Sequence, residues 1–295
     1  MNKYALITGG SAGIGLAVAR ELALRGYGLV LVARSEEKLA LARESLMRDL
    51  NKEIDILTLS LDLTREDAAQ TLFDWTQQQG LIVEVLVNNA GMYFFEEAIV
   101  LDAAKTQALI RLNILTLTRL CQLFGAEMAE RKLAAGRVNP VEKAGPAYIL
   151  NISSYSVYMP WAGWSLYSAS KAYVKNFSLA LARELRSRAV VVSCAAPAGV
   201  ATSLLGLPGK LARLGRRCGI LMSPQTCARR IVRALFRQRE YIIPGWYYWP
   251  LIPIVKCIGW CFPQKLHRLL TKIFSLKASA QQTDNHEIRT SRKRT

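Results

Sequence analysis

Short apolar runs alternate with longer segments of helical periodicity along the first 240 residues. Runs such as Tyr4–Thr8, Gly28–Ala33 and Ile149–Ile152 are rich in Val, Ile and Leu, which is typical of strands buried on both faces. Between them lie segments such as Leu16–Leu24, whose apolar positions recur at helical spacing. This alternation predicts an α/β fold with a doubly wound parallel sheet and helices on both faces.

No internal repeat or Ser/Gly-rich linker divides the 295 residues, so we expect a single domain. The domain is expected to cover residues 1–240, with an apolar and basic helical extension over 241–277. Residues 278–295 are polar and are expected to form a disordered basic tail. The first apolar strand begins almost at Met1 with no secretory leader pattern before it, which predicts a cytoplasmic location.

The first predicted strand runs directly into a glycine-rich turn that opens a helix. Gly9, Gly13 and Gly15 occupy this turn. Glycines let the backbone turn tightly and approach a pyrophosphate, and a helix N-terminus offers free N–H groups to it. An ordinary turn that uses glycine for geometry alone is the alternative, but the order of strand, turn and helix favours a dinucleotide site.

The ends of the next two predicted strands bear on which dinucleotide is bound. The second strand ends at Arg34 without a carboxylate, and an arginine there can hold the 2′-phosphate of NADP. Arg34 therefore favours NADP(H) over NAD(H), with a solvated arginine as the alternative. The third strand, Ile56–Leu61, is followed by Asp62 and Leu63, which could face an adenine; Asp62 could equally belong to the N-cap region of the following helix.

Tyr167 and Lys171 lie four residues apart in a helical segment, so their side chains share one helix face. A free tyrosine has a pKa near ~10, and a fixed lysine charge nearby lowers it. Such a pair can give a proton to a carbonyl oxygen or take one from a hydroxyl. The spacing alone is also common on solvated helix faces, so its meaning depends on the rest of the chain.

Motifs in a fixed order make the chain resemble the short-chain dehydrogenase/reductase family over about residues 3–240. They are Thr8-Gly9-x-x-x-Gly13-x-Gly15, Asn88-Asn89-Ala90-Gly91, Asn113, Ser154, Tyr167-x-x-x-Lys171 and Pro197-x-Gly199-Val200-x-Thr202. Each motif is a modest signal, but their joint order and spacing are specific. The resemblance implies a Rossmann-type domain, an NADP-dependent enzyme acting on CH–OH or C=O groups, and a homo-oligomer, either a dimer or a tetramer.

The resemblance also implies roles for the catalytic candidates Asn113, Ser154, Tyr167 and Lys171. Tyr167 would protonate the developing alkoxide, and Ser154 would hydrogen-bond the same oxygen. Lys171 would lower the tyrosine pKa and contact the nicotinamide ribose, while Asn113 would hold a water in the proton relay. Ser154 lies 13 residues before Tyr167, the family spacing, and is preferred to Ser153 because neighbouring strand residues point to opposite faces.

The residues expected to bind the cofactor lie at strand ends, in the turns that follow them and on the catalytic helix. They are Thr8, Gly9, Ser11, Gly13, Ile14, Gly15, Arg34, Asp62, Leu63, Asn89, Ala90, Gly91, Tyr167, Lys171, Pro197, Gly199, Val200 and Thr202. The chain departs from the family where Ala198 replaces the usual glycine after Pro197, which puts the shape of that loop in doubt. The stretch Leu133–Ala147 is also longer than a tight helix–strand connection needs.

Apolar side chains near the catalytic pair predict a hydrophobic substrate. The expected substrate-lining residues are Met159, Trp161, Trp164, Leu204 and Leu205. Such a lining suits a fatty-acyl, sphingoid or steroid-like ketone, and hence a role in lipid metabolism. The rings could instead pack in the core or at a subunit interface, because aromatic side chains dominate both settings.

No metal site is expected, because the six cysteines show no CxxC spacing and the histidines are limited to His267 and His286. Cys121, Cys194 and the other cysteines are therefore interpreted as thiols of a reducing compartment.

The positive charge of the chain is concentrated towards its C-terminus. The net charge is +17, and residues 205–295 hold 18 Lys and Arg against 3 Asp and Glu. Residues 241–263 are apolar and aromatic with basic residues on both sides, as is typical of a membrane interface. We hypothesise peripheral attachment to the anionic inner leaflet, with a flap over the active site or a dimer contact as the alternative. Nucleic-acid binding is not expected, because no recognition motif accompanies the charge.

These expectations together describe an NADP(H)-dependent oxidoreductase that reduces the carbonyl of a hydrophobic substrate, such as a 3-oxoacyl, sphingoid or steroid-like ketone. Oxidation of a lipophilic alcohol by the same residues is one alternative. A non-catalytic NADP-binding scaffold at the membrane is the other, and a complete set of catalytic candidates argues against it because a binding-only protein does not need them.

Overall fold

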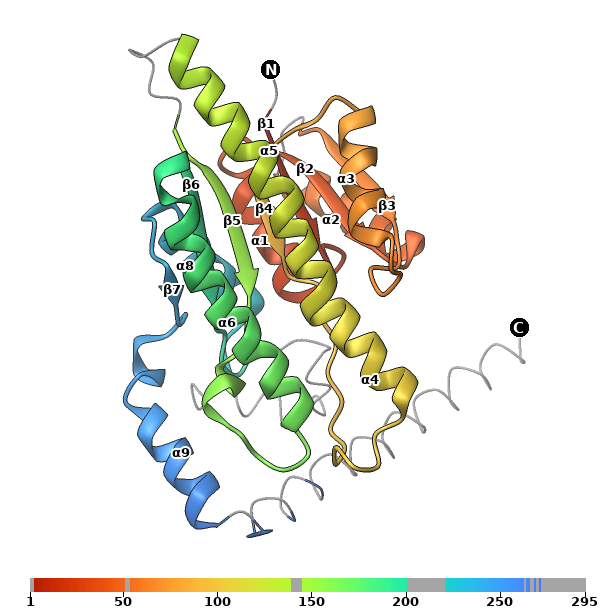
Figure 1. Cartoon of the computed structure of the whole chain (residues 1–295). Helices are drawn as coiled ribbons and strands as arrows, with labels where there is room; N and C mark the ends of the chain where they lie inside the picture. Colours follow the sequence, from red (N-terminus) through yellow and green to blue (C-terminus); the bar gives the residue numbers. More distant parts are fainter. Residues whose placement is uncertain are drawn as a thin grey trace, which may run out of the picture.

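A parallel β-sheet forms the centre of the molecule (Figure 1). The computed structural model describes residues 3–50, 54–138, 145–200 and 221–262, together with positions 264, 265, 268 and 271. Within these residues the sheet has seven strands in the order β3-β2-β1-β4-β5-β6-β7. They are β1 (Lys3–Thr8), β2 (Gly28–Ala33), β3 (Ile56–Ser60), β4 (Ile82–Asn88), β5 (Ala147–Ile152), β6 (Val190–Ala195) and β7 (Tyr241–Ile242).

Helices cover both faces of this sheet, which confirms the predicted doubly wound fold. The helices are α1 (Gly13–Ala23), α2 (Glu36–Leu50), α3 (Ala68–Gln78), α4 (Ala103–Ile110), α5 (Leu117–Val138), α6 (Ser165–Leu185), α8 (Pro224–Phe236) and α9 (Leu251–Cys261). One apolar core packs α1, α2 and α8 against the sheet, and a second packs α3, α5 and α6 against the other face, towards the viewer in Figure 1.

Alternation along each strand divides its side chains between these two cores. On β1, Ala5 and Ile7 enter the first core while Tyr4 and Leu6 enter the second. Every described residue of β5 is buried, as expected for a central strand with both faces covered. The strand order reverses between β1 and β4, and ligands of such folds bind beyond the carboxyl ends of the strands at this point.

The sheet continues past residue 240, where we expected the extension to begin. β7 pairs with β6 through Tyr241 opposite Cys194 and Ile242 opposite Ala195. After β7 comes a short helical turn, Trp246–Tyr248, and then α9. The connection expected over 133–147 is partly helical, because α5 continues to Val138. The tail 278–295 lies outside the described residues.

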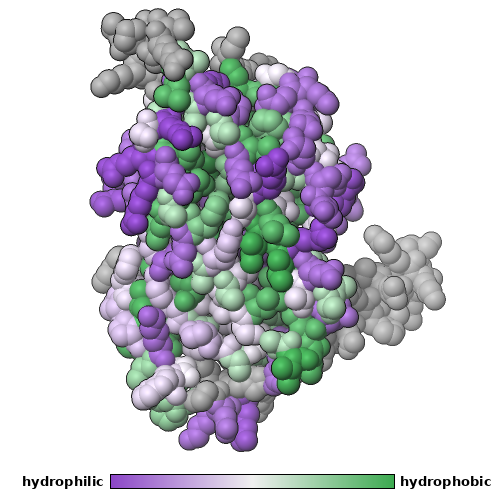
Figure 2. All heavy atoms as spheres, in the orientation of Figure 1, coloured by the Kyte–Doolittle hydropathy of each residue, from purple (hydrophilic) through white to green (hydrophobic). Residues whose placement is uncertain are grey.

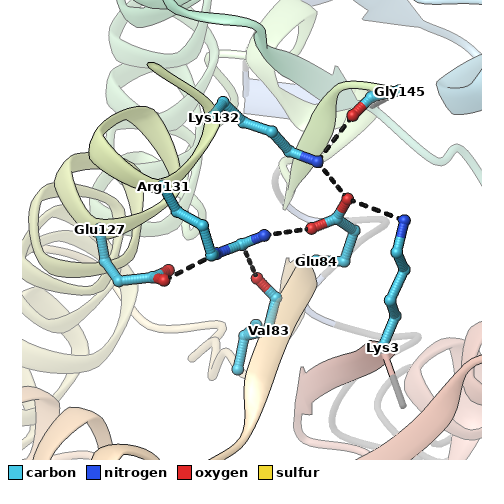
Figure 3. Close-up of polar contacts among 7 residues, drawn as sticks. All are labelled: Lys3, Val83, Glu84, Glu127, Arg131, Lys132 and Gly145. Atoms are coloured by element: carbon cyan, nitrogen blue, oxygen red, sulfur yellow. Dashed lines mark hydrogen bonds and ion pairs between the residues drawn. The ribbon is translucent and has the colours of Figure 1, made fainter. Parts of the chain in front are cut away.

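A cluster of charges fastens α5 to the end of the sheet opposite the nucleotide crevice (Figure 3). Glu84 of β4 is 2% exposed, and its carboxylate accepts hydrogen bonds from Lys132 and, at 2.6 Å, from Arg131. Lys3 lies 3.5 Å from the same carboxylate. Burial alone raises the pKa of Glu84. The hydrogen bonds and charges of Lys132 and Arg131 lower it by more than burial raises it, so the net pKa is below its usual value.

Replacing Glu84 with Gln is expected to lower the free energy of unfolding by about 3–5 kcal/mol, because it leaves the buried Lys132 ammonium without its counter-charge. Urea unfolding at pH 7 measures this loss. Glu127→Gln is the matched control, since Glu127 pairs with Arg131 and is more exposed than Glu84. This change should lower the free energy of unfolding by no more than about 1 kcal/mol. Equal urea midpoints for the two variants would show that the buried charge of Glu84 stabilises the fold no more than the exposed charge of Glu127 does.

Candidate active site

The glycine-rich turn after β1 is packed too tightly to accept side chains at Gly9 and Gly15. Gly9 and Gly13 have φ angles of +65° and +58°, a region that favours glycine. A Cβ at Gly15 would lie 2.3 Å from the carbonyl oxygen of Gly9. The first turn of α1 has no side-chain cap and no acidic residue, so its N–H groups face the turn. This geometry fits a pyrophosphate group.

Two side chains expected to bind the cofactor shape this turn from behind. The Thr8 hydroxyl accepts hydrogen bonds from the backbone N–H groups of Asn89 and Ala90, each at 3.0 Å. The Asn89 amide donates to the carbonyl oxygens of Thr8 at 2.9 Å and Gly9 at 3.1 Å. These bonds join the ends of β1 and β4, so Thr8 and Asn89 hold the floor of the crevice in place.

A cavity of about 240 Å³ lies beyond the ends of β2 and β3. Its lining includes Arg34, Asp62 and Leu63, three residues that the sequence suggested, and also Lys38 of α2. The Asp62 carboxylate accepts from the N–H and hydroxyl of Thr64, at 3.0 and 2.8 Å, and these bonds lower its pKa. Asp62 thus borders the cavity and also shapes the turn before α3.

Lys38 was missed by the sequence reasoning. It lies four residues after Arg34, and both side chains are exposed at the same cavity. Arg34 follows β2 and Lys38 lies in the first turn of α2, so a second cation this close to the strand end was a signal that could have been used. Two cations at this point provide a site for an anionic group.

A second cavity, of about 430 Å³, brings together three of the four catalytic candidates, and Asn113 does not line it. Ser154, Tyr167 and Lys171 all line it. The Ser154 oxygen accepts from the N–H of Ser156 at 3.1 Å and hydrogen-bonds the Tyr167 hydroxyl. The neighbouring Ser153 is buried and donates instead to the carbonyl oxygen of Lys171 at 2.7 Å. The two serines therefore face different ways, as strand alternation predicts.

The pKa of Tyr167 differs from the expectation that Lys171 would lower it. Burial raises this pKa, a hydrogen bond from Ser154 lowers it, and nearby Tyr93 raises it; the net value is above that of free tyrosine. The Lys171 ammonium lies 5.9 Å from the centre of the Tyr167 ring and donates to the Ile152 carbonyl at 3.0 Å. Because burial dominates, Tyr167 is a neutral phenol at pH 7.

Lys171 is itself perturbed by its surroundings. It is 5% exposed, and burial lowers the pKa of its ammonium to about 8, with Cys194 acting weakly in the opposite direction. The ammonium thus carries its charge at neutral pH and loses it in mildly alkaline solution. A Cβ at Gly91 would lie 3.3 Å from this nitrogen, so glycine there keeps the approach to Lys171 open.

Asn113 lies in a π-helical turn, Arg111–Thr116, and is fully buried. Its amide oxygen accepts from the N–H of Met92, and its amide nitrogen donates to the Met92 carbonyl and to the Ser170 hydroxyl, at 2.9 and 3.1 Å. These contacts tie the loop after β4 to α6. The π-helical turn widens the helix at this point, a feature often found at functional sites.

The apolar lining agrees only in part with the expected substrate residues. Met159 and Trp164 line the cavity, as do the cofactor candidates Ile14, Pro197, Gly199 and Val200. Trp161 does not; its ring stacks on Trp164, and its N–H donates to the Val255 carbonyl at 3.3 Å. Thr202, Leu204 and Leu205 lie outside the described residues.

Several lining residues were not found from the sequence. They include Tyr93, Tyr248, Leu251 and Val255. The last three belong to the segment from the Trp246–Tyr248 turn to α9, which was considered either as a membrane segment or as a flap. These three residues on its inner side line the cavity, and we call this segment the cap.

The described residues hold neither a metal-binding cluster nor a membrane-spanning helix. Among the described residues, no group of three or more His, Cys, Asp or Glu side chains is placed to hold a metal ion. No helix in the described part of the chain has the length and apolarity that crossing a membrane requires.

Known proteins resemble this chain over most of the sheet. A family model described as short chain dehydrogenase matches residues 3–207. The 17-beta-hydroxysteroid dehydrogenase type 3 of Mus musculus is 35% identical over 208 residues, covering 69% of this chain and 62% of that protein. The chain therefore spans less than two thirds of that relative's length. The very-long-chain 3-oxoacyl-CoA reductase of Mus musculus is 30% identical over 273 residues, covering 85% of this chain and 79% of that protein.

Solved structures share the fold. A short-chain dehydrogenase from Sphingobium yanoikuyae in complex with NADPH has a TM-score of 0.69 and 26% identity, covering 90% of this chain and 97% of that chain. The bulky-bulky ketone specific alcohol dehydrogenase from Comamonas testosteroni has a TM-score of 0.68 and 25% identity, covering 87% and 92%. With the matched family model and the motifs placed along one crevice, the chain belongs to the short-chain dehydrogenase/reductase family.

Proposed function

We propose that this protein is an NADP(H)-dependent oxidoreductase that reduces the carbonyl group of a hydrophobic substrate. The observation that carries the proposal is the position of the Tyr167 hydroxyl, beside Ser154 and Lys171, in a cavity whose other walls are largely apolar. The crevice beside it has the glycine turn and the open helix N-terminus that a dinucleotide needs.

In this proposal the protein positions a proton donor at the substrate oxygen. The Tyr167 hydroxyl donates its proton to the carbonyl oxygen as negative charge develops there, and Ser154 donates a hydrogen bond to the same oxygen. A donor aimed at such an oxygen in a site shielded from water is worth about 3–4 kcal/mol. When bound, NADPH would supply the hydride, and Ile14, Pro197, Gly199 and Val200, which line the cavity, would hold its nicotinamide end.

The raised pKa of Tyr167 suits the proton donor of a reduction. A proton donor must carry its proton at the working pH, and a buried neutral phenol does so. The oxidation would need the same residue as a phenolate. Lys171, charged below about pH 8, stabilises the tyrosine as it loses its proton.

The proposed preference for NADPH rests on the two cations at the adenine end of the crevice. Arg34 and Lys38 both line the cavity in which the 2′-phosphate would lie. The similar Sphingobium yanoikuyae structure contains NADPH, which agrees with this choice. Asp62 borders the same cavity, but Thr64 already occupies one of its oxygens.

Replacing both Arg34 and Lys38 with Ala is expected to weaken NADPH binding roughly 30- to 1000-fold, because each charged hydrogen bond to a phosphate contributes about 1.5–3 kcal/mol and the two need not add fully. NADH affinity should change by no more than about twofold, since NADH lacks the 2′-phosphate. Titration calorimetry with both cofactors measures the difference. Arg43→Ala, an exposed arginine on the same helix, is the control. Equal losses for NADPH and NADH would contradict the assignment.

The proposed substrates are lipophilic ketones. Met159, Trp164, Leu251 and Val255 give the cavity its apolar walls. The names of the two mouse relatives indicate a steroid in one case and a very-long-chain 3-oxoacyl thioester in the other. The test is NADPH consumption by the full chain with a panel of ketones of increasing chain length, 3-oxoacyl thioesters and steroid ketones. Turnover that rises with apolar surface supports the proposal; no turnover with any class would revive the binding-only scaffold.

A further inference from the structure

Three segments far apart in the chain contact one another beside the catalytic cavity, where Trp164 and Val255 line it, and we call them the rim. Phe95, in the loop between β4 and α4, packs edge-on against Trp164, with ring centres 6.2 Å apart. Trp164 stacks on Trp161 at 6.0 Å, and Trp161 donates its hydrogen bond to Val255 of α9. A Cβ at Gly259 would lie 2.6 Å from the Trp161 nitrogen, so α9 sits directly on this ring.

The outer side of α9 is apolar and faces away from the protein. No residue of α9 is buried, although the helix consists mostly of Leu, Ile, Val, Cys and Trp. Trp260 is 85% exposed, and Ile254 and Phe262 are 51% and 53% exposed. A helix whose inner side closes a cavity while its outer side exposes large apolar residues is expected to have a second contact.

A second exposed apolar patch lies on another segment of the same rim. Ile99 and Val100, in the loop before α4, are 90% and 69% exposed. Glu96 of this loop is paired with Lys105, while the exposed carboxylates of Glu97 and Asp102 also flank the patch, so its contact with a lipid surface would rest on its apolar side chains. In Figure 1 this loop and α9 both lie at the lower end of the molecule, towards which the strands point. Figure 2 shows deep green patches at the lower right and lower left, and purple residues at the lowest point.

The charge around α9 indicates what this face contacts. Lys256 lies on α9 itself, and Lys265 and Arg268 follow it; all three are exposed. No Asp or Glu occurs between residues 241 and 283. Lysine and arginine next to exposed tryptophan and isoleucine suit an anionic lipid surface, where the rings enter the headgroup region and the cations pair with phosphates. A second copy of the chain would bring another basic face, which repels the first.

The length of α9 suits a helix that lies on a bilayer. Its 11 residues extend about 16 Å, while a spanning helix needs about 20 residues. Pro253 lies in its first turn, where a missing N–H costs no helical hydrogen bond. The helix can therefore lie in the interface with its inner side still on Trp161.

We propose that the rim docks on an anionic bilayer at two points, the outer side of α9 and the Ile99–Val100 patch, so that the mouth of the catalytic cavity opens onto the lipid. A lipid-phase ketone then reaches Tyr167 without passing through water. The docking itself stands apart from catalysis, and only the route of the substrate rests on the proposed function.

Flotation of the full chain with vesicles tests the two-point contact. Vesicles of phosphatidylcholine with one quarter phosphatidylglycerol should carry the wild type upward, and pure phosphatidylcholine should do so at least tenfold less well. Both Trp260→Asp and the double variant Ile99→Asp/Val100→Asp should weaken binding to the anionic vesicles at least tenfold. The matched control is Leu41→Asp/Met47→Asp, since these α2 residues are 59% and 53% exposed but lie away from the rim; it should stay within about twofold of wild type.

Two further measurements make each outcome decisive. NADPH affinity of every variant reports whether the fold is intact, and Tyr167→Phe should float like the wild type although it lacks activity. If the protein does not reduce ketones, its binding to the vesicles should therefore still be observed. Three results would overturn the docking proposal: no binding of the wild type to anionic vesicles, unchanged binding of the Ile99→Asp/Val100→Asp variant, or an oligomer that the rim variants dissociate while vesicle binding is absent.

Discussion

Replacing Tyr167 with Phe will lower kcat for ketone reduction by roughly 10³-fold while NADPH affinity stays within about twofold. The change removes one oxygen atom, the proton donor of the site, and leaves a ring of nearly the same shape in the cavity. Ser154 and Lys171 cannot replace it: Ser154 is a poor acid, and the Lys171 ammonium is directed at the Ile152 carbonyl. The loss should therefore appear in the reaction and not in binding.

The matched control for this change is Tyr173→Phe on the same helix. Tyr173 is exposed, and its hydroxyl contacts Thr118 at 2.9 Å, outside the catalytic cavity. Its loss should change kcat by less than about twofold, since surface substitutions away from a site rarely alter it. A Tyr167→Phe enzyme with more than a tenth of wild-type kcat would show that the proton comes from another group.

Replacing Lys171 with Met will lower kcat by roughly 10²-fold and remove an alkaline limb from the pH profile. The ammonium is charged below a pKa of about 8 and neutral above it, because burial lowers that pKa. If the charge stabilises Tyr167 as its proton leaves, the wild-type kcat should fall as the pH rises through about 8. In the variant this fall should be absent.

Lys175→Met is the control, because Lys175 lies one turn further along α6 and packs between the rings of Tyr158 and Tyr241. This variant should keep both the alkaline limb and most of the activity. An unchanged limb in Lys171→Met would assign the titration to a different group and leave Lys171 with a structural role only.

The parts of the site that could be predicted are those formed by neighbours in the chain. The glycines at positions 9 and 13 adopt positive φ because a tight turn must follow a buried strand at that point. Ser154 could be chosen over Ser153 because it lies 13 residues before Tyr167, the family spacing, while strand alternation indicates that the two hydroxyls point opposite ways. Arg34 was predicted at the crevice because strand ends meet at one edge of a parallel sheet.

The parts that could not be predicted depend on contacts between distant segments. Trp161 and Val255 are 94 positions apart, and their hydrogen bond decides that Trp161 supports the cap and does not line the cavity. Tyr248 and Leu251 line the cavity only because the chain returns to it after β7. The raised pKa of Tyr167 likewise results from burial, which a spacing of four residues cannot reveal.

In the proposed function, Tyr167 protonates a substrate carbonyl in an NADPH-dependent reduction. The most direct test measures NADPH consumption and alcohol product together, with the full chain and the best ketone of the panel. We expect one alcohol for each NADPH with the wild type, and with Tyr167→Phe a rate of alcohol formation roughly 10³-fold lower although NADPH still binds. The proposed function is contradicted if NADPH binds but no ketone is reduced, or if Tyr167→Phe forms the alcohol at more than a tenth of the wild-type rate.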